Sequence, residues 1–473
     1  LPLLSDEGSL TVFPIERTIV LLERIFPFLT AGLVLVAVVL QSGDAAAKKR
    51  TFIRDSETEN TIRAFATPVF QAAGLDPSAV QVYLINDSAL NAFVAGGQKL
   101  FINTGLLMRS ESPGQVIGVI AHETGHIAGG HLSRTHDAIA KSSAQQIVAM
   151  VLGAAAAIGS RRSDVGAAVM AGGQRAALGT FLHYSRTQEA SADAAAMKYL
   201  EATGQSSKGM LDFLGTLADQ ELLSARYQDP YLRSHPLTRE RIRAIANHVS
   251  QSRFSNTPAP ASFLEMFDRM RAKLLAFLEP TSRTLRRYKN TDQSLSARYA
   301  RAIAYFRKSD LTKALPIINT LVAERPQDPY FNELKGQMLF ESGRVTEALA
   351  PSEAAVRMAP HSSLIRLQLA RIQLELNDPT LLDKAIGNLR VAQQREPQSA
   401  SIWRSLAIAH GRKGEMGQSA LAMAEEAFLR GKKRDARHHA TRAKKILPAG
   451  SPGALKADDI LSATKKKKDE KKK

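Results

Sequence analysis

The sequence predicts a mainly α-helical protein in which an α+β domain with a small sheet is followed by an α-solenoid. The first observation is the pentapeptide His122-Glu123-Thr124-Gly125-His126, which ends an apolar stretch of helical pattern and follows several short strand-like segments. The second is a 34-residue recurrence of prolines and small residues in the C-terminal half. The 473 residues, 44% hydrophobic and 23% charged, have an ordinary globular composition and suffice for two or more cores.

Residues 1–47 are expected to form a signal peptide. Ile25 to Gly43 are 19 uncharged residues, and Ala45 and Ala47 then form an A-x-A cleavage signal. These features predict an exported, periplasmic protein. The alternative is an uncleaved membrane anchor, because the apolar run is long enough to span a bilayer and the positive charges at 48–50 would resist translocation. The absence of cysteine excludes a disulfide framework and a thiolate metal site, but leaves the compartment undecided.

Residues 48–255 are expected to form the α+β domain. Segments 81–86, 91–94 and 99–104 are predicted to be short strands, with a turn at Gly96-Gly97. We expect one edge strand to align an extended polypeptide substrate by main-chain pairing. The edge strand predicted from the sequence consists of Lys99, Leu100, Phe101, Ile102, Asn103 and Thr104.

The pentapeptide has the spacing of a zinc site on a helix. Ser112-Pro113 supplies a helix start, and on the helix His122 and His126 project from one face, one turn apart, where both imidazoles can hold a single Zn²⁺. Glu123 is rotated by about 100° from His122, so that it can act as general base without occupying a coordination position. The alternative, a merely polar face of an amphipathic helix, fits less well with the apolar surroundings.

A catalytic zinc needs a third protein ligand, and Glu189 is the best candidate. Glu189 and Asp193 are four residues apart in an alanine-rich helical segment, so Glu189 could bind the metal while Asp193 orients a ligand histidine through its other ring nitrogen. A solvated acidic helix face is the alternative. His131 does not complete a metzincin motif, because that motif requires histidine where Leu132 stands, and we expect it to be structural.

Two apolar stretches, at 147–158 and 167–182, separate the histidines from Glu189. Neither reaches membrane-spanning length before a polar or charged residue interrupts it. They predict a helical hairpin over the site, acting either as a lid or as a contact to a membrane surface.

Residues 256–292 are expected to form a helical connector after the proline-rich boundary near 255–260. Its apolar residues recur at helical spacing and are expected to be core. They are Phe263, Met266, Phe267, Met270 and Leu274.

Residues 293–450 are expected to form about four tetratricopeptide repeats with an additional offset helix. Pro326 and Pro360 stand 34 residues apart, with small residues at matching offsets before each, as this repeat requires where its two helices approach. A third unit ends three residues late at Pro397, which predicts extra residues at 377–380. Such a solenoid holds a partner or delivers a substrate. Helical hairpins without repeat character are the alternative.

Residues 451–473 are expected to form a basic disordered tail. Lys465 to Lys473 carry seven lysines against two acidic residues, a net charge of +5, and the rest of the net charge of +18 is spread. A terminal lysine run is usually solvated, and otherwise would bind anionic lipid or envelope polymer. Specific nucleic-acid binding fits poorly, because no recognition motif or set of stacking aromatics accompanies the charge.

Three segments together resemble a known peptidase family. Residues 122–131, 185–193 and 234–242 are similar to the gluzincin peptidases related to HtpX and the CAAX prenyl protease, most closely to a periplasmic branch. The resemblance implies one Zn²⁺ per chain on His122, His126 and Glu189, with Glu123 as base and Asp193 behind a ligand. It also implies that His235 can approach the metal as a fourth ligand or latch; a His-Pro turn that packs a helix start is the alternative.

These observations predict a zinc-dependent endopeptidase of the bacterial cell envelope that degrades misassembled outer-membrane proteins. The expected partners are misfolded envelope polypeptides and, as the resemblance implies, the outer-membrane assembly machinery. The alternative is a chaperone or scaffold for envelope protein assembly in which proteolysis is latent.

Overall fold

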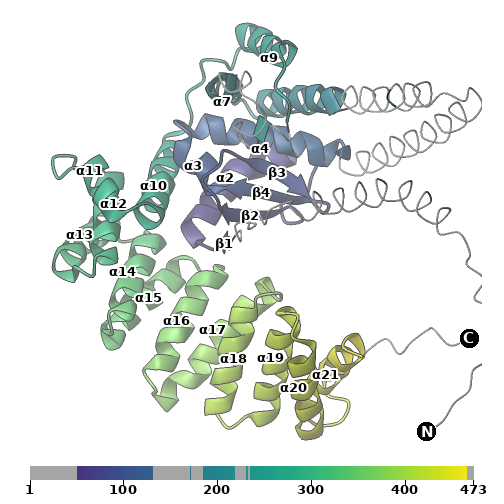
Figure 1. Ribbon diagram of the computed structural model, residues 1–473. Helices are drawn as coiled ribbons and strands as arrows, with labels where there is room; N and C mark the ends of the chain where they lie inside the picture. The colour runs from purple at the N-terminus through teal and green to yellow at the C-terminus, as the bar shows by residue number, and fades with distance from the viewer. Residues whose placement is uncertain (1–50, 132–170, 172–184, 219–230, 233–234, 466–473) are drawn as a thin grey trace, which may run out of the picture. The chain divides into compact units, whose positions relative to one another are not determined.

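The computed structural model describes residues 51–131, 171, 185–218, 231–232 and 235–465 (Figure 1). Within these residues the protein is mainly helical with one small sheet, so the expected fold class is confirmed. Across the same ranges, none of the helices combines the length and apolarity needed to cross a membrane. The predicted signal peptide or anchor and the predicted helical hairpin lie outside the described residues.

The sheet has four strands in the order β1-β2-β4-β3. β1 pairs antiparallel with β2, β2 runs parallel to β4, and β4 pairs antiparallel with β3. An aromatic side chain from every strand joins one row of ring contacts across a face of the sheet, from Phe52 through Tyr83 and Phe101 to Phe93. The strands are β1 (Thr51–Ile53), β2 (Gln81–Asn86), β3 (Ala92–Ala95) and β4 (Lys99–Asn103).

The prediction that Lys99 to Thr104 form the edge strand is wrong. β4 is paired on both sides, and Thr104 is the first residue of helix α3. Gly96 and Gly97 have φ of +55° and +89° and turn the chain into a hairpin that leaves β3, not β4, on the outside. In the described residues, β3 is therefore the edge strand on this side of the sheet.

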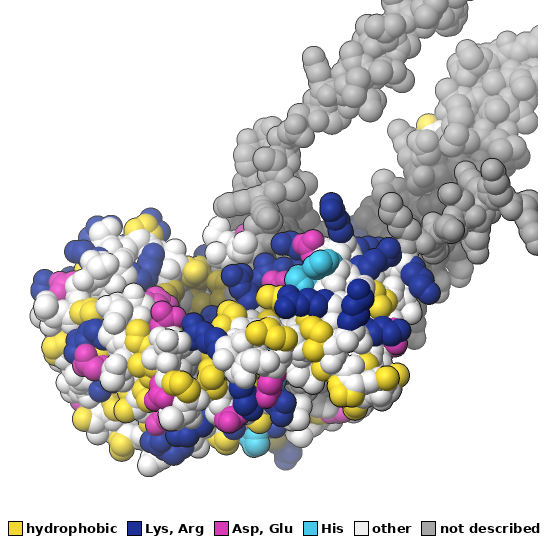
Figure 2. All heavy atoms as spheres, turned by 90° about the horizontal axis from the view of Figure 1, so that it is seen from below, with side chains coloured by type: hydrophobic (Ala, Val, Ile, Leu, Met, Phe, Trp, Pro, Cys, Tyr) yellow, Lys and Arg dark blue, Asp and Glu magenta, His cyan; other side chains and the backbone are white. Residues whose placement is uncertain are grey.

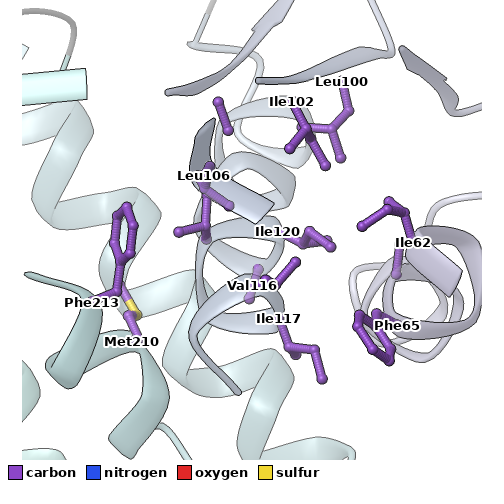
Figure 3. Close-up of a cluster of buried hydrophobic side chains, with 14 of the residues drawn as sticks. Ile62, Phe65, Leu100, Ile102, Leu106, Val116, Ile117, Ile120, Met210 and Phe213 are labelled. Carbon is purple, nitrogen blue, oxygen red and sulfur yellow. The ribbon is translucent and has the colours of Figure 1, made fainter. Parts of the chain in front are cut away.

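The core of the domain lies between the sheet and helices α2 and α4. α4 begins where the sequence predicts, with Ser112 as N-cap and Pro113 in its first turn. Figure 3 shows Ile117 and Ile120 of α4 directed toward Ile62 and Phe65 of α2, and all four side chains are buried. The helices here are α2 (Ser56–Ala72), α3 (Thr104–Arg109) and α4 (Pro113–Ala128).

Further helices surround α4 on the side of the histidines. Residues 185–202, which carry Glu189 and Asp193, are helical. Met210 and Phe213 of α7 pack into the same core as α4, as Figure 3 shows. The remaining elements of this domain are α7 (Lys208–Ala218) and α9 (Arg239–Gln251).

The connector is helical, as expected, and belongs to two cores. Phe267, Met270 and Leu274 of α10 are buried in the core around α4. Ala272 and Ala276 of the same helix are buried among the first helices of the repeat region. The connector consists of α10 (Ala261–Leu278) and α11 (Thr281–Arg287).

The C-terminal half is an array of antiparallel helix pairs (Figure 1). Four pairs are present, and the short 3-10 helix η1 (Pro379–Leu381) occupies the place where extra residues were expected. The pairs are α12 (Leu295–Arg307) with α13 (Leu311–Glu324), α14 (Pro329–Glu341) with α15 (Val345–Met358), α16 (Ser363–Glu375) with α17 (Leu382–Arg395), and α18 (Ala400–Arg412) with α19 (Met416–Leu429).

Two more helices follow, and the second corrects the prediction of a disordered tail from residue 451. α20 (Lys433–Ile446) is the expected additional helix, and α21 (Pro452–Ala463) packs against it. Ser451 caps α21, and Ala457 and Ile460 are buried in the last apolar cluster of the array. The lysine run begins only at Lys465, after the end of this helix. Residues 466–473 lie outside the described part of the chain.

Basic side chains are distributed over the surface. Figure 2 shows lysine and arginine side chains across the whole of the face in view, interspersed with acidic and apolar ones. On this face the basic side chains are therefore spread and not gathered into one patch.

Candidate metal centre

The two motif histidines point their Nε2 atoms at one place. His122 and His126 lie on α4, four residues apart, with 1% and 8% of their surface exposed. Their Nε2 atoms are 3.1 Å apart. Because ring nitrogens this close cannot both carry protons directed at each other, at least one of them presents a lone pair to the common centre.

Glu189 completes this set from the helix at 185–202. Its Oε2 lies 3.3 Å from the Nε2 of His122, and its Oε1 lies 3.3 Å from the Nε2 of His126. Gly125 permits the close approach of the two helices, because a Cβ there would stand 2.7 Å from the carbonyl oxygen of Ala192. The structure thus brings the three residues chosen from the sequence into one buried cluster.

His235 is the fourth member of the cluster. Its Nδ1 lies 3.2 Å from both carboxylate oxygens of Glu189 and 3.3 Å from the Nε2 of His122. Tyr231, four residues earlier and buried, places its ring 4.6 Å from that of His235. His235 is itself only 6% exposed, so the loop before α9 holds it inside the protein.

The spacing of these donor atoms fits a single metal ion. The potential ligand atoms of His122, His126, Glu189 and His235 all lie within 4.8 Å of one another, and the measured separations given above are 3.1 to 3.3 Å. Donors about 2.0 Å from an ion at the centre of a tetrahedron stand about 3.3 Å apart. The residues therefore fit a four-coordinate metal ion.

The buried charges also call for a cation. Glu123, Glu189 and Asp193 contribute three formal negative charges, against one positive charge from Arg241, and all four are nearly inaccessible to solvent. With neutral histidines the balance is two negative charges, which a divalent ion would cancel. Burial opposes protonation of His122, yet its hydrogen bonds with Asp193 and Glu189 raise the pKa of His122 to about 10. The site thus attracts positive charge.

Asp193 lies behind His122, at the ring nitrogen that faces away from the donor cluster. The Nδ1 of His122 donates to Oδ1 of Asp193 over 2.8 Å, which directs Nε2 toward the cluster. Although burial acts to raise it, hydrogen bonds from His122 and Arg241 hold the pKa of Asp193 below its usual value. Asp193 is therefore an ionised acceptor that fixes the tautomer and orientation of His122.

Arg241, to which the sequence analysis gave no role, connects three parts of the site. Its guanidinium donates to Asp193 over 2.6 and 2.9 Å and lies 3.0 Å from Oε2 of Glu189. It also donates to the carbonyl oxygen of Pro236, next to His235, over 2.8 Å. Its position six residues after His235, on the first turn of α9, is the only signal in the sequence that could have indicated it.

Glu123 is adjacent to the donors without being one of them. Its Oε1 lies 3.4 Å from the Nε2 of His235, and the side chain is fully buried. Within the described residues neither carboxylate oxygen of Glu123 has a hydrogen-bond partner, nor has the Nε2 of His235. Buried polar atoms without partners are costly, so these atoms indicate a place for water or substrate beside the donors.

A buried set of nitrogen and oxygen donors beside an unpartnered carboxylate is the arrangement that the active site of a metalloprotease requires. Comparison with known proteins agrees. Residues 55–249 match the profile of peptidase family M48, and residues 299–363 match that of the tetratricopeptide repeat. The chain therefore carries an M48 metalloprotease domain, with tetratricopeptide repeats behind it.

Several known proteins are similar to this chain over most of its length. The beta-barrel assembly-enhancing protease of Yersinia pestis is 22% identical over 355 residues, which cover 74% of this chain and 71% of the relative. The protein of that name from Escherichia coli strain K12 is 24% identical over 357 residues, with the same coverage. A Vibrio cholerae protein provisionally given this name is 25% identical over 401 residues, which cover 80% of this chain and 77% of the relative.

Proposed function

We propose that this protein is a zinc-dependent endopeptidase with one Zn²⁺ per chain. The observation that carries the proposal is the cluster of four side chains whose donor atoms all lie within 4.8 Å of one another, beside the unpartnered carboxylate of Glu123. Zinc is the metal that best matches imidazole and carboxylate donors in a tetrahedral arrangement, with no cysteine in the chain. His122, His126 and Glu189 are the permanent ligands in this proposal.

In this proposal, each residue around the zinc site has a separate role in peptide hydrolysis. When bound, zinc supplies Lewis acidity, which lowers the pKa of water and polarises a carbonyl group. Glu123 takes the proton of the attacking water and returns it to the amine that leaves. Asp193 holds the ligand His122 in place, and Arg241 holds the ligand Glu189. Since β3 is the edge strand beside α4, we assign the alignment of an extended substrate to Ala92–Ala95.

His235 acts as a latch in this proposal. Its Nδ1 occupies the fourth corner of the donor set, where a catalytic zinc site keeps a position for water. With His235 in place, the enzyme is closed, and movement of the loop before α9 would open it. The support is the position of the ring, packed on Tyr231 and tied to Arg241 through the carbonyl of Pro236.

The cellular role that we infer is the removal of misassembled outer-membrane proteins in the periplasm. Its support is the name of the relatives, which are proteases that enhance beta-barrel assembly. The repeat array offers a surface for polypeptide partners, including the assembly machinery, because stacked helix pairs form extended binding surfaces. Contact of the protein with a membrane surface is compatible with this role.

A second candidate function is a chaperone or scaffold with latent proteolysis. The observation that favours it is the closed geometry, in which His235 occupies the place that water needs. In that case the repeats perform the main function and cleavage is an exceptional event.

Glu123→Gln distinguishes the two functions. The substitution removes the base and keeps the side-chain volume, so zinc content should remain near one per chain while cleavage of an unfolded polypeptide falls by at least about 10²-fold. Turnover of misassembled barrel proteins in cells should stop in this variant if the protein is a working endopeptidase. Turnover that continues unchanged would favour the scaffold, and purified protein without bound zinc would contradict the zinc assignment itself.

A further inference from the structure

His126 is supported from behind by another histidine. Its Nε2 faces the donor cluster, and its Nδ1 lies 3.0 Å from the Nδ1 of His131. Both rings are buried, with centroids 5.0 Å apart and planes at 83°. His131 therefore holds, relative to His126, the place that Asp193 holds relative to His122.

The proton count of this pair fixes its direction. Two ring nitrogens 3.0 Å apart share one proton, which belongs to one ring and is accepted by the lone pair of the other. If Nε2 of His126 is a metal ligand, its lone pair is committed there, and the neutral ring carries its proton on Nδ1. The Nδ1 of His131 is then the acceptor, and His131 carries its own proton on Nε2.

The chain is shaped to put His131 in this position. α4 ends at Ala128, and Gly130 has a φ of +62°, in the left-handed region, which turns the backbone so that His131 folds back along the helix. A Cβ at Gly129 would stand 2.4 Å from the Nε2 of His131, so a larger residue there would displace the ring. The sequence Gly129-Gly130-His131 is thus a built support for His126.

We propose that His131 is a positioning residue that fixes the tautomer and the ring orientation of His126 as a metal ligand. This replaces the expectation that His131 is only structural, and it rests on the proposed function, in which His126 binds zinc. A neutral acceptor suits the site, because a carboxylate at this place would add a third uncompensated negative charge to the two already buried.

Zinc affinity of the full-length holoprotein tests the proposal. In His131→Phe the ring volume stays but the acceptor is lost, and zinc should bind about 10- to 100-fold more weakly in competition with a chelator. In His131→Asn the side-chain oxygen can take the place of Nδ1, and most of the affinity should return. Thermal unfolding of the metal-free proteins controls for folding. Equal zinc affinity in wild type and His131→Phe would overturn the role of His131.

Nitrogen NMR of histidine-labelled, zinc-loaded wild-type protein gives a second answer that does not depend on any variant folding. The expected pattern is a proton on Nδ1 of His126 and on Nε2 of His131. A proton on Nδ1 of His131 would overturn the proposal, because that atom could then not accept from His126, and zinc bound at Nε2 of His126 in the same sample would leave the proposed function intact. Wild-type protein that binds no zinc would instead overturn the proposed function, and this inference with it.

Discussion

The Nδ1 atom of His235 lies 3.2 Å from both carboxylate oxygens of Glu189. Glu189 faces the two motif histidines with the same two oxygens, so His235 is in contact with the centre of the donor set. The two residues come from segments 46 positions apart, and in the proposed latch the loop before α9 moves to separate them. This contact is the basis of the proposed latch, which substitution of His235 can test.

His235→Ala should increase the rate of peptide cleavage. Removing the ring opens the fourth position while His122, His126 and Glu189 remain, and if about nine molecules in ten are closed, the rate should rise about tenfold. Steady-state cleavage of an unfolded polypeptide measures it, with zinc content determined in parallel. His248→Ala, at a partly buried histidine of α9, is the control and should have no effect. Unchanged or lower cleavage in His235→Ala would argue against a latch.

Arg241→Gln should destabilise the protein strongly. The guanidinium is the cation that balances the buried carboxylates of Asp193 and Glu189, and both hold the pKa of Arg241 above its usual range in spite of burial. Removing one partner of a buried ion pair costs about 3–5 kcal/mol. Denaturant unfolding of the zinc-loaded protein measures the loss. Arg243→Gln, at an exposed position of the same helix, is the matched control, and similar losses in the two variants would contradict the assignment.

The donors on α4 and at 189 could be chosen from sequence because helical spacing places residues four apart on one face. Arg241 could not, since its ion pair with Asp193 spans 48 residues and depends on where α9 packs. The edge strand was misplaced for a similar reason: alternation of apolar residues identifies β4 as a strand, but the order of strands depends on which segments pair. Sequence spacing does not reveal the contact between His131 and His126, because this contact depends on the turn at Gly130.

Gly125→Ala should weaken both the fold and the metal site. The new Cβ would lie 2.7 Å from the carbonyl oxygen and 2.9 Å from the Cα of Ala192, which are backbone atoms and cannot rotate away. The helix at 185–202 would have to move outward, and this movement would increase the distance between Glu189 and His126. We expect a loss of about 1–3 kcal/mol in the free energy of unfolding, together with weaker zinc binding.

Gly215→Ala is the control for this substitution, because nothing lies within 4 Å of a Cβ at Gly215 in α7. Alanine there should stabilise the helix by up to about 1 kcal/mol and leave zinc affinity unchanged. A Gly125→Ala variant that keeps wild-type zinc affinity and stability would show that the two helices are not held at this distance.

Glu333→Gln should change how stability depends on pH. Glu333 is buried on α14, one of its carboxylate oxygens has no partner among the described residues, and Lys273 of α10 faces it together with Asp55 and Glu57. Burial, reinforced by the two neighbouring carboxylates and opposed by the lysine, raises the pKa of Glu333 to about 8. The native protein therefore retains a proton that the unfolded chain releases near pH 4.5.

The stabilisation that comes from this proton is complete below about pH 4.5 and is lost as the pH rises through about 8. Between these limits the wild-type free energy of unfolding should fall, relative to that of Glu333→Gln, by up to about 1.4 kcal/mol per pH unit. Denaturant unfolding of both proteins at about pH 5.5, 7 and 8, within this window, measures the difference between their free energies of unfolding. The titration of all other groups cancels in this difference. Glu341→Gln, exposed on the same helix, should show the wild-type dependence. Parallel curves for wild type and Glu333→Gln would mean that Glu333 is ionised in the native protein, and that Lys273 neutralises it.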